Sequence, residues 1–339
     1  MTPNILLIYT GGTIGMVKDY DTGALRSFNF DNLLLKIPEL RHLDCEISAV
    51  SFETPLDSSN MNPEFWTQIC EFIQEGYDRY DGFVVLHGSD TMSYTASGLS
   101  FMLENLAKPV IFTGSQLPIG DLRTDAKENL ITAIQLAGLR KRNRPMIQEV
   151  ALYFEYKLYR ANRTTKISAE QFEAFDSPNY LPLLTSGVHL QINEEALLRP
   201  AKRVFKVHTN LVKDIMLIKL FPGMCQNVFE HMLSLDGLKG VVLETYGSGN
   251  ATTAPWFISA LKDAIKRGIS IVNITQCNTG SVKMGNYETS VELKKIGIIN
   301  GGNMTTEAAV AKMMYLLGQQ LGPKAFKTVY ETSLRGELS

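Results

Sequence analysis

The sequence lacks several features that assign a chain to a common class of protein. It has no excess of either charge, since 33 lysines and arginines stand against 35 aspartates and glutamates in 339 residues, so no global field favours nucleic acid as a partner. No apolar run approaches the roughly 18 residues of a membrane span. The first residues have no basic segment before their apolar run, so we expect no secretory signal and a cytoplasmic location.

Cysteine is also scarce and widely spaced. The chain has four cysteines and none of them forms a Cys-x-x-Cys pair: Cys45, Cys70, Cys225 and Cys277. This spacing argues against a zinc or redox centre. We expect free thiols in a reducing compartment.

What is present is enough apolar sequence, 45% of the residues, to bury a sizeable core. Short apolar runs alternate with longer segments of helical period, a pattern that predicts a parallel sheet flanked by helices. The predicted strands are residues 5–9, 83–86, 110–112, 150–154, 215–220, 240–243 and 269–274. The length favours two domains.

Predicted helices separate these strands. Asn62 can cap a helix that has Pro63 at its first position, a second helix follows Asp90, and a third carries Leu130. Two more are expected at residues 256–267 and 305–321. The predicted fold class is α/β, with a larger N-terminal doubly wound, mostly parallel sheet at residues 1–190, a linker at 191–211, and a smaller C-terminal α/β domain at 212–339.

Two loops that follow predicted strands carry hydroxyl side chains. Ligands of an open parallel sheet bind at the carboxyl ends of its strands, so these loops are the first candidates. In YTGGTIG, Gly11 and Gly12 permit a tight turn from which Thr13 projects. In HGSDT, Ser89 and Asp90 enter the next helix, although Asp90 alone is equally well explained as an N-cap. The glycine-rich loop matches neither GxxxxGK(S/T) nor GxGxxG, which argues against nucleotide binding.

A polar run, NRTTK at residues 162–166, follows the predicted strand at 150–154 and can reach the same edge of the sheet. Lys166 alone is most simply a surface lysine. Beside Ser89 and Asp90, however, it supplies what a hydroxyl nucleophile lacks: a base that can be neutral when desolvated and that a carboxylate can hold.

Together, the segments YTGGTIG, TPLDSSNM, HGSDTM, TGSQLP, NRTTK and TYGSGN resemble the bacterial-type L-asparaginases in order and spacing. The similarity covers nearly the whole chain and is closest to the cytoplasmic, type I branch. It implies hydrolysis of L-asparagine to L-aspartate and ammonia through a hydroxyl nucleophile and a β-aspartyl acyl-enzyme. No metal or organic cofactor is expected.

The resemblance also implies roles for single residues. Thr13 matches the first family threonine, usually taken as the nucleophile. Ser89 matches the second, with Asp90 and Lys166 completing its triad, and Asp90 also matches the ligand of the substrate's α-ammonium group.

Other residues match the substrate-binding part of the family site. Asp57, Ser58 and Ser59 correspond to the loop that holds the α-carboxylate and α-amino groups. Backbone N–H groups at the turn before Ser89, or near Ser115, are expected to stabilise an oxyanion. Asn250 matches a residue that reaches over from a neighbouring subunit, which implies a homodimer or homotetramer.

The sequence departs from the family pattern in three places. Ser89 replaces the threonine of HGTDT, so a hydroxyl remains but a methyl is lost, and we expect activity to be retained but reduced. Residues 16–27 either form a lid that supplies Tyr20 or are a surface loop. Glu244 stands where some cytoplasmic relatives carry the arginine of an allosteric asparagine site, while Cys277 is kept, so we expect no asparagine allostery of that form.

Two alternative functions remain consistent with the sequence. One is a glutaminase-leaning or tRNA-dependent amidohydrolase, although the chain has neither an extra N-terminal domain nor a basic excess. The other is a non-catalytic sensor that binds asparagine or aspartate. A pure binding protein needs no second hydroxyl triad, which favours the enzyme.

Overall fold

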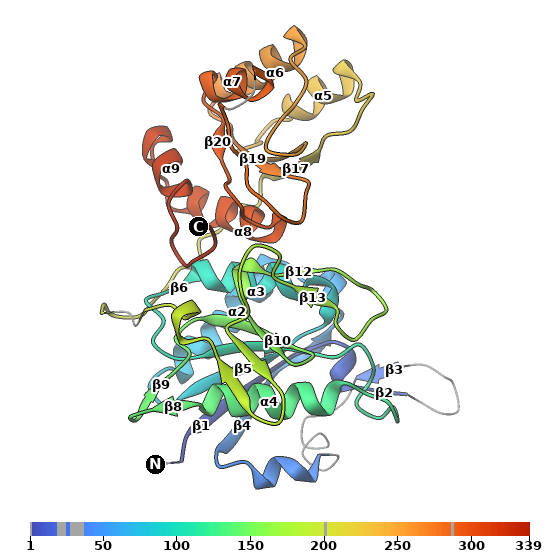
Figure 1. Ribbon diagram of the computed structural model, residues 1–339, viewed down its shortest axis with the longest axis vertical. Helices are drawn as coiled ribbons and strands as arrows, with labels where there is room; N and C mark the ends of the chain where they lie inside the picture. Colours follow the sequence, from blue (N-terminus) through green and yellow to red (C-terminus); the bar gives the residue numbers. More distant parts are fainter. Residues whose placement is uncertain (1, 19–24, 28–36, 200–201, 286–287) are drawn as a thin grey trace. The chain divides into compact units, whose positions relative to one another are not determined.

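The computed structural model describes residues 2–18, 25–27, 37–199, 202–285 and 288–339. The chain divides into two compact units, Met1–Thr209 and Asn210–Ser339 (Figure 1). The predicted linker, residues 191–211, spans this division, and the predicted domain limits stay a prediction.

The described part of the first unit contains a sheet of eight strands in the order β15-β14-β11-β10-β7-β5-β1-β4. Strands β10, β7, β5, β1 and β4 are parallel to one another, and β11, β14 and β15 continue the sheet beyond β10 in antiparallel pairing. Their bounds are β1 Asn4–Gly11, β4 Glu46–Leu56, β5 Gly82–Leu86, β7 Val110–Thr113, β10 Val150–Phe154, β11 Lys157–Arg160, β14 Leu184–Ser186 and β15 Leu190–Ile192.

The parallel part of this sheet is doubly wound. From the inner strand β1 the chain first adds β4 on one side and then β5 on the other, so the winding direction reverses between β1 and β5. All residues of β5, β7 and β10 are buried, as expected for parallel strands covered on both faces. In such a sheet the crevice at the reversal point, outside the carboxyl ends of the strands, is where ligands bind.

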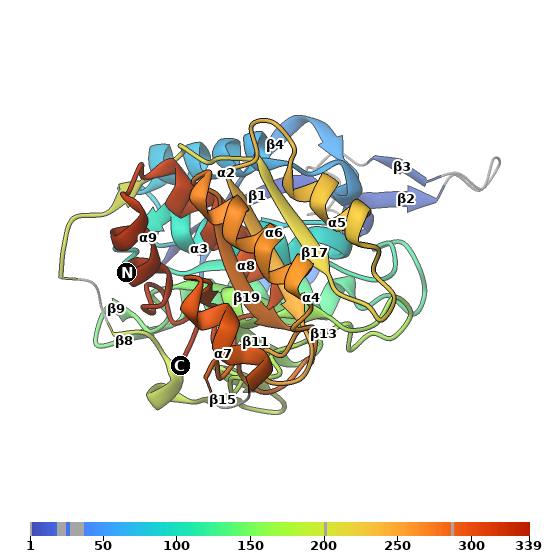
Figure 2. The same cartoon turned by 90° about the horizontal axis from the view of Figure 1, so that it is seen from above.

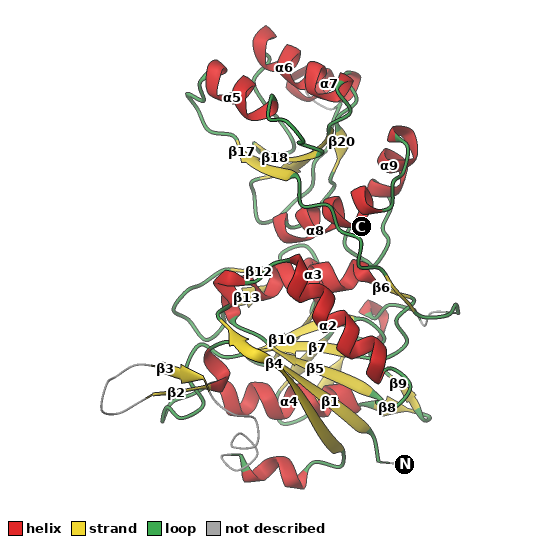
Figure 3. Ribbon diagram, turned by 180° about the vertical axis from the view of Figure 1, so that it is seen from behind, coloured by secondary structure: helices red, strands yellow, loops and turns green. Residues whose placement is uncertain are grey.

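Helices cover both faces of the sheet. Helix α4, Ala126–Gly138, packs on one face, and α2, Pro63–Gly76, and α3, Met92–Met102, lie on the other (Figure 3). The predicted cap is confirmed, because the Asn62 side chain accepts hydrogen bonds from the backbone of Glu64 and Phe65. Short two-stranded pairs complete the unit: β2 Met16–Lys18 with β3 Leu25–Ser27, β6 Leu103–Glu104 with β16 Lys206–Val207, β8 Arg140–Lys141 with β9 Arg144–Pro145, and β12 Thr165–Lys166 with β13 Phe175–Asp176.

The second unit is a smaller parallel sheet with the sequential order β17-β18-β19-β20. Helices α5 and α6 lie side by side on one face (Figure 2), and α8 packs on the other. The bounds are β17 Ile215–Lys219, α5 Gln226–Leu233, β18 Gly240–Thr245, α6 Pro255–Lys266, β19 Ser270–Thr275, α7 Glu288–Lys295, β20 Ile299–Asn300, α8 Thr306–Gly318 and α9 Pro323–Tyr330.

The predicted fold class is confirmed, with a larger doubly wound first unit and a smaller α/β second unit. Each of the seven predicted strands and five predicted helices is found to within a few residues. No helix among the described residues is both long and apolar enough to cross a membrane.

Candidate active site

The two hydroxyl loops predicted from the sequence flank the reversal point of the sheet. After β1, Gly12 has a φ of +86°, a conformation that favours glycine. A Cβ on Gly12 would overlap the backbone of Gly88, in the loop after β5, so the two loops meet backbone to backbone. Thr13 is the residue after Gly12, and Ser89 is the residue after Gly88. Both are partly exposed. The glycines therefore set how closely the two hydroxyl residues approach.

Ser89, Asp90 and Lys166 form a connected polar group. Lys166 Nζ donates to Ser89 Oγ at 2.9 Å and to Asp90 Oδ1 at 2.6 Å. The lysine side chain is 18% exposed, while that of Asp90 is 66% exposed. Asp90 does not cap the next helix, because the N-cap of α3 is Thr91 and has no side-chain capping bond. The carboxylate instead holds the lysine against the serine.

Lys166 is held by a buried segment. The β10–β11 hairpin leads into the turn Ala161–Arg163, which is buried throughout, and then into β12. Thr164 Oγ1 lies 3.1 Å from Ser93 Oγ in α3, the helix that begins just after the Ser89 loop. The Arg163 guanidinium is also buried and lies over the Tyr180 ring. Ser89 and Lys166 are therefore tied to the same packed helix.

The predicted substrate loop lies against the Ser89 loop. Ser58 is buried, a Cβ on Gly88 would be 2.5 Å from its Oγ, and Thr91 Oγ1 donates to the Ser58 carbonyl at 2.7 Å. Asp57 accepts hydrogen bonds from the Ser59 backbone N–H and hydroxyl, both at 2.8 Å. These bonds, the backbone one first, lower the pKa of the Asp57 carboxyl. The loop thus presents a carboxylate that is well suited to stay ionised.

Ser115 lies on the loop after β7, the next strand of the sheet. Its side chain is buried and donates to the Leu117 carbonyl at 2.6 Å. Asp125, at the start of α4, accepts hydrogen bonds from the backbone N–H groups of Gln116 and Leu117. A Cβ on Gly114 would overlap the His87 carbonyl, so this loop also packs tightly against the loop after β5.

Two residues of the site escaped the sequence analysis. His87, fully buried, has its Nδ1 2.7 Å from the Gly88 carbonyl, and burial lowers its pKa to about 4. Gln116 accepts a hydrogen bond from Ser89 Oγ at 3.1 Å. No local motif signals either contact, because a buried histidine and a loop glutamine are common for purely structural reasons.

The remaining predicted residues lie elsewhere. Asn250 is in the second unit, on the loop after β18, where its backbone pairs with Tyr246 and it lines a cavity of about 520 Å³. Glu244 is buried, accepts a hydrogen bond from Thr306 Oγ1 and lies 3.6 Å from Lys219 Nζ. Tyr20 falls outside the described residues, and its role and the absence of allostery stay predictions.

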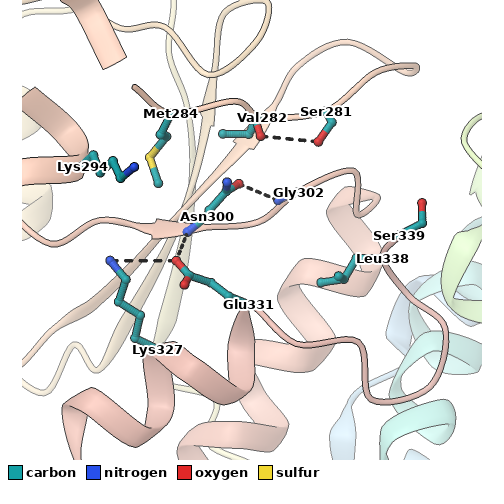
Figure 4. Close-up of a pocket in the computed structure, with 10 residues that line it drawn as sticks. All are labelled: Ser281, Val282, Met284, Lys294, Asn300, Gly302, Lys327, Glu331, Leu338 and Ser339. Atoms are coloured by element: carbon teal, nitrogen blue, oxygen red, sulfur yellow. Dashed lines mark hydrogen bonds and ion pairs between the residues drawn. The ribbon is translucent and has the colours of Figure 1, made fainter. Parts of the chain in front are cut away.

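A separate cavity of about 430 Å³ lies in the second unit and contains none of the predicted site residues (Figure 4). Lys294, Asn300, Lys327 and Glu331 contribute its polar lining. In the part of the chain that the structure describes, no three or more His, Cys, Asp or Glu side chains are placed to hold a metal ion.

Comparison with known proteins assigns both units. A family model described as Asparaginase, N-terminal matches residues 4–198, and one described as Glutaminase/Asparaginase C-terminal domain matches residues 214–330. The fold and these matches define the class as two-domain α/β amidohydrolases. The chain belongs to the asparaginase family.

Single relatives match nearly the whole chain. L-asparaginase 1 of Escherichia coli (strain K12) is 43% identical over 337 residues, which cover 99% of this chain and 98% of that protein. The 60 kDa lysophospholipase of Mus musculus is 40% identical over 362 residues, with coverage of 99% of this chain and 62% of that protein. The crystal structure of L-asparaginase I from Vibrio cholerae matches with a TM-score of 0.91 and 40% identity over the full length of both chains. The resemblance to the type I branch is thereby confirmed.

Proposed function

We propose that the protein is an L-asparagine amidohydrolase that forms L-aspartate and ammonia. The observation that carries this proposal is the contact of Lys166 with both Ser89 and Asp90, next to Thr13 at the reversal point of the sheet, in a chain of this family. The group combines a nucleophile, a second hydroxyl, an amine and a carboxylate. Such a set can activate a hydroxyl for attack on an amide.

The substrate-binding role falls to side chains around these hydroxyls. Asp57 and Asp90 supply carboxylates for the α-ammonium group. Ser58 and Ser59 supply donors for the α-carboxylate, and the Ser59 hydroxyl turns from Asp57 to the substrate when the amino acid binds. Ser115 lies on the neighbouring loop, where a backbone N–H can stabilise negative charge on the amide oxygen. An amino acid held at both of its α groups presents its side-chain amide to Thr13.

The reaction proceeds in two steps. The Thr13 hydroxyl oxygen attacks the side-chain amide carbon while a base takes its proton, and the base returns that proton to the amide nitrogen as the C–N bond breaks and ammonia leaves. Water then attacks the resulting β-aspartyl ester and releases L-aspartate and free Thr13. Ser89, Asp90 and Lys166 act beside the reacting carbon, and no metal or organic cofactor takes part.

The assembly is part of the proposal. Asn250 completes the site of a neighbouring subunit, so the working unit is a homodimer or a homotetramer. The substrate is a small molecule, neither nucleic acid nor membrane is a partner, and the location is cytoplasmic. The names L-asparaginase 1 and L-asparaginase I of two relatives support a small-molecule substrate, and the balanced charge of the chain argues against nucleic acid as a partner.

Ammonia release from L-asparagine and, separately, from L-glutamine tests the function. We expect rapid turnover of asparagine and a loss of at least about 10³-fold in Thr13→Ala, since the attacking oxygen is gone. Thr328→Ala, which removes an exposed hydroxyl from α9, is the matched control and should leave turnover unchanged.

The other outcomes separate the alternatives. Faster turnover of glutamine than of asparagine would favour a glutaminase. Calorimetric binding of asparagine by well-folded protein without any ammonia release would favour the sensor.

A further inference from the structure

Ser89 needs something to fix its side chain. A threonine at this position is stiff about χ1 because both its methyl and its hydroxyl branch from Cβ, whereas a serine populates three staggered rotamers more freely. Only one rotamer places the hydroxyl next to Lys166. Since Ser89 is partly exposed, packing alone does not select that rotamer.

Two hydrogen bonds act on the Ser89 hydroxyl from different directions. Its oxygen accepts from Lys166 Nζ at 2.9 Å, and its hydrogen is donated to Gln116 Oε1 at 3.1 Å. A hydroxyl that both accepts and donates has its donor and acceptor sites occupied at once. Lys166 therefore holds the oxygen of the Ser89 hydroxyl, and Gln116 holds its hydrogen.

Gln116 is itself anchored at both ends. Its backbone N–H donates to Asp125 Oδ1 and Oδ2 at 3.1 and 2.9 Å, and Asp125 is only 6% exposed. Its side-chain Nε2 donates to the Gln171 carbonyl at 3.0 Å. Both the main chain and the amide group of Gln116 are thus held in place.

The second anchor leads back to the base. Gln171 lies on the connection between β12 and β13, and β12 carries Lys166. Ser89 therefore touches this hairpin twice, directly through Lys166 and indirectly through Gln116 and the Gln171 carbonyl. The result is a closed ring of hydrogen bonds around the hydroxyl.

We propose that Gln116 is a positioning residue that holds the Ser89 hydroxyl in the rotamer that contacts Lys166, a constraint that matters more for a serine than for the stiffer side chain of a threonine. The proposal rests on the proposed function, because it assigns the role of one more residue in that site. The proposal predicts that the effect of a Gln116 substitution on kcat depends on whether residue 89 is serine or threonine.

A double-mutant cycle tests this dependence. Turnover of asparagine is measured for the unmodified protein, Gln116→Met, Ser89→Thr and the double variant. Methionine keeps the length of the side chain and removes both hydrogen bonds of its amide. We expect Gln116→Met to lower kcat about tenfold with little change in KM when residue 89 is serine, and less than about threefold when it is threonine.

Equal losses in the two backgrounds would overturn the proposal, as would a loss that falls mainly on KM, since that indicates a direct contact of Gln116 with substrate. No loss in either background would overturn it as well. Gln148→Met is the matched control, because the Gln148 side-chain amide also donates to a backbone carbonyl, that of Pro145. Gln148 precedes the N-terminal end of β10, whereas the loops of the proposed site follow the carboxyl ends of the strands. Gln148→Met should not change kcat.

A second measurement does not depend on activity. High-resolution crystal structures of the unmodified protein and of Gln116→Met report the rotamer of Ser89 directly. We expect one rotamer in the first and at least two in the second, and a single Ser89 rotamer in both would contradict the proposal. If the unmodified protein releases no ammonia, the proposed function fails, whereas the rotamer result still decides the role of Gln116.

Discussion

His87 makes stability depend on pH through a single buried side chain. It precedes the Ser89 loop, its Nδ1 lies 2.7 Å from the Gly88 carbonyl, and its Nε2 has no hydrogen-bond partner among the described residues. Burial without a counter-charge disfavours the imidazolium form and lowers the pKa to about 4. The folded chain therefore requires the neutral ring, with the Nδ1 hydrogen donated to the carbonyl.

The sign of the pH effect follows from this shift. The unfolded chain binds a proton at His87 below pH about 6.5, whereas the folded chain does not until pH about 4. The contribution to stability is complete above the unfolded pKa and is lost as the pH falls towards 4, at up to about 1.4 kcal/mol per pH unit. We expect His87→Asn, whose amide can keep the bond to Gly88, to lose stability less steeply over this window.

The measurement is the midpoint of thermal unfolding at pH values from 4 to 8. Of the two tryptophans, Trp66 is buried in the first unit and Trp256 lies in the second, so a Trp256→Phe background makes fluorescence report the first unit alone. Parallel curves for the variant and its parent would show that His87 does not titrate as described.

The sequence predicted several residues of the site but not all of the hydrogen bonds between them. Ser89 and Asp90 follow β5 of the parallel part of the sheet, and the structure places both in contact with Lys166. Lys166 reaches them by a route that the sequence did not indicate, because the antiparallel strand β11 and the turn Ala161–Arg163 lie between β10 and this lysine. The contact of Ser89 with Gln116 could not be predicted, because it depends on the direction in which one flexible side chain points. The interpretation of Asp90 as an N-cap is wrong for a similar reason, because the direction of its side chain decides its partner and its carboxylate binds Lys166.

At the scale of elements, the buried parallel strands were predictable and the edges of the sheet were not. Strands such as β10 are continuous apolar runs, which the sequence shows plainly. Strand β4 mixes exposed and buried positions, and β14 and β15 are only three residues long, so none of them has a clear period. The reversal point between β1 and β5 depends on β4, and it therefore became visible only in the structure.

The close approach of the loops after β1 and β5 depends on Gly12. An alanine there must keep a φ of +86° and place its Cβ against the Gly88 backbone, so we expect Gly12→Ala to push the loops apart. Misplacement of Thr13 should reduce kcat at least about 100-fold while the circular dichroism spectrum is retained.

Gly268 provides the matched control for backbone strain. Its φ is +92°, but nothing lies within 4 Å of a Cβ added there. Gly268→Ala should cost about 1 kcal/mol of stability and leave kcat unchanged. If the two variants have similar activity, the contact of Gly12 with Gly88 does not position Thr13.

At the scale of the whole molecule, the proposed site takes residues from two chains. Thr13, Ser89 and Lys166 lie in the first unit, whereas Asn250 lies in the second, on a loop beside exposed Phe221. If Asn250 serves a neighbouring subunit, a chain that lacks Thr13 can still supply Asn250 to its partner. Two inactive variants should then restore activity when they assemble together.

Co-expression of Thr13→Ala with Asn250→Ala tests this arrangement. Each variant alone should have little activity. In a mixed dimer one site carries both defects and the other carries none, so random assembly should restore about a quarter of the normal turnover. Co-expression of Thr13→Ala with Ser89→Ala is the control, because both residues belong to one chain's part of the site and no mixed dimer contains an intact site. Activity no greater than the sum of the two parents in the first mixture would mean that Asn250 does not act across the interface.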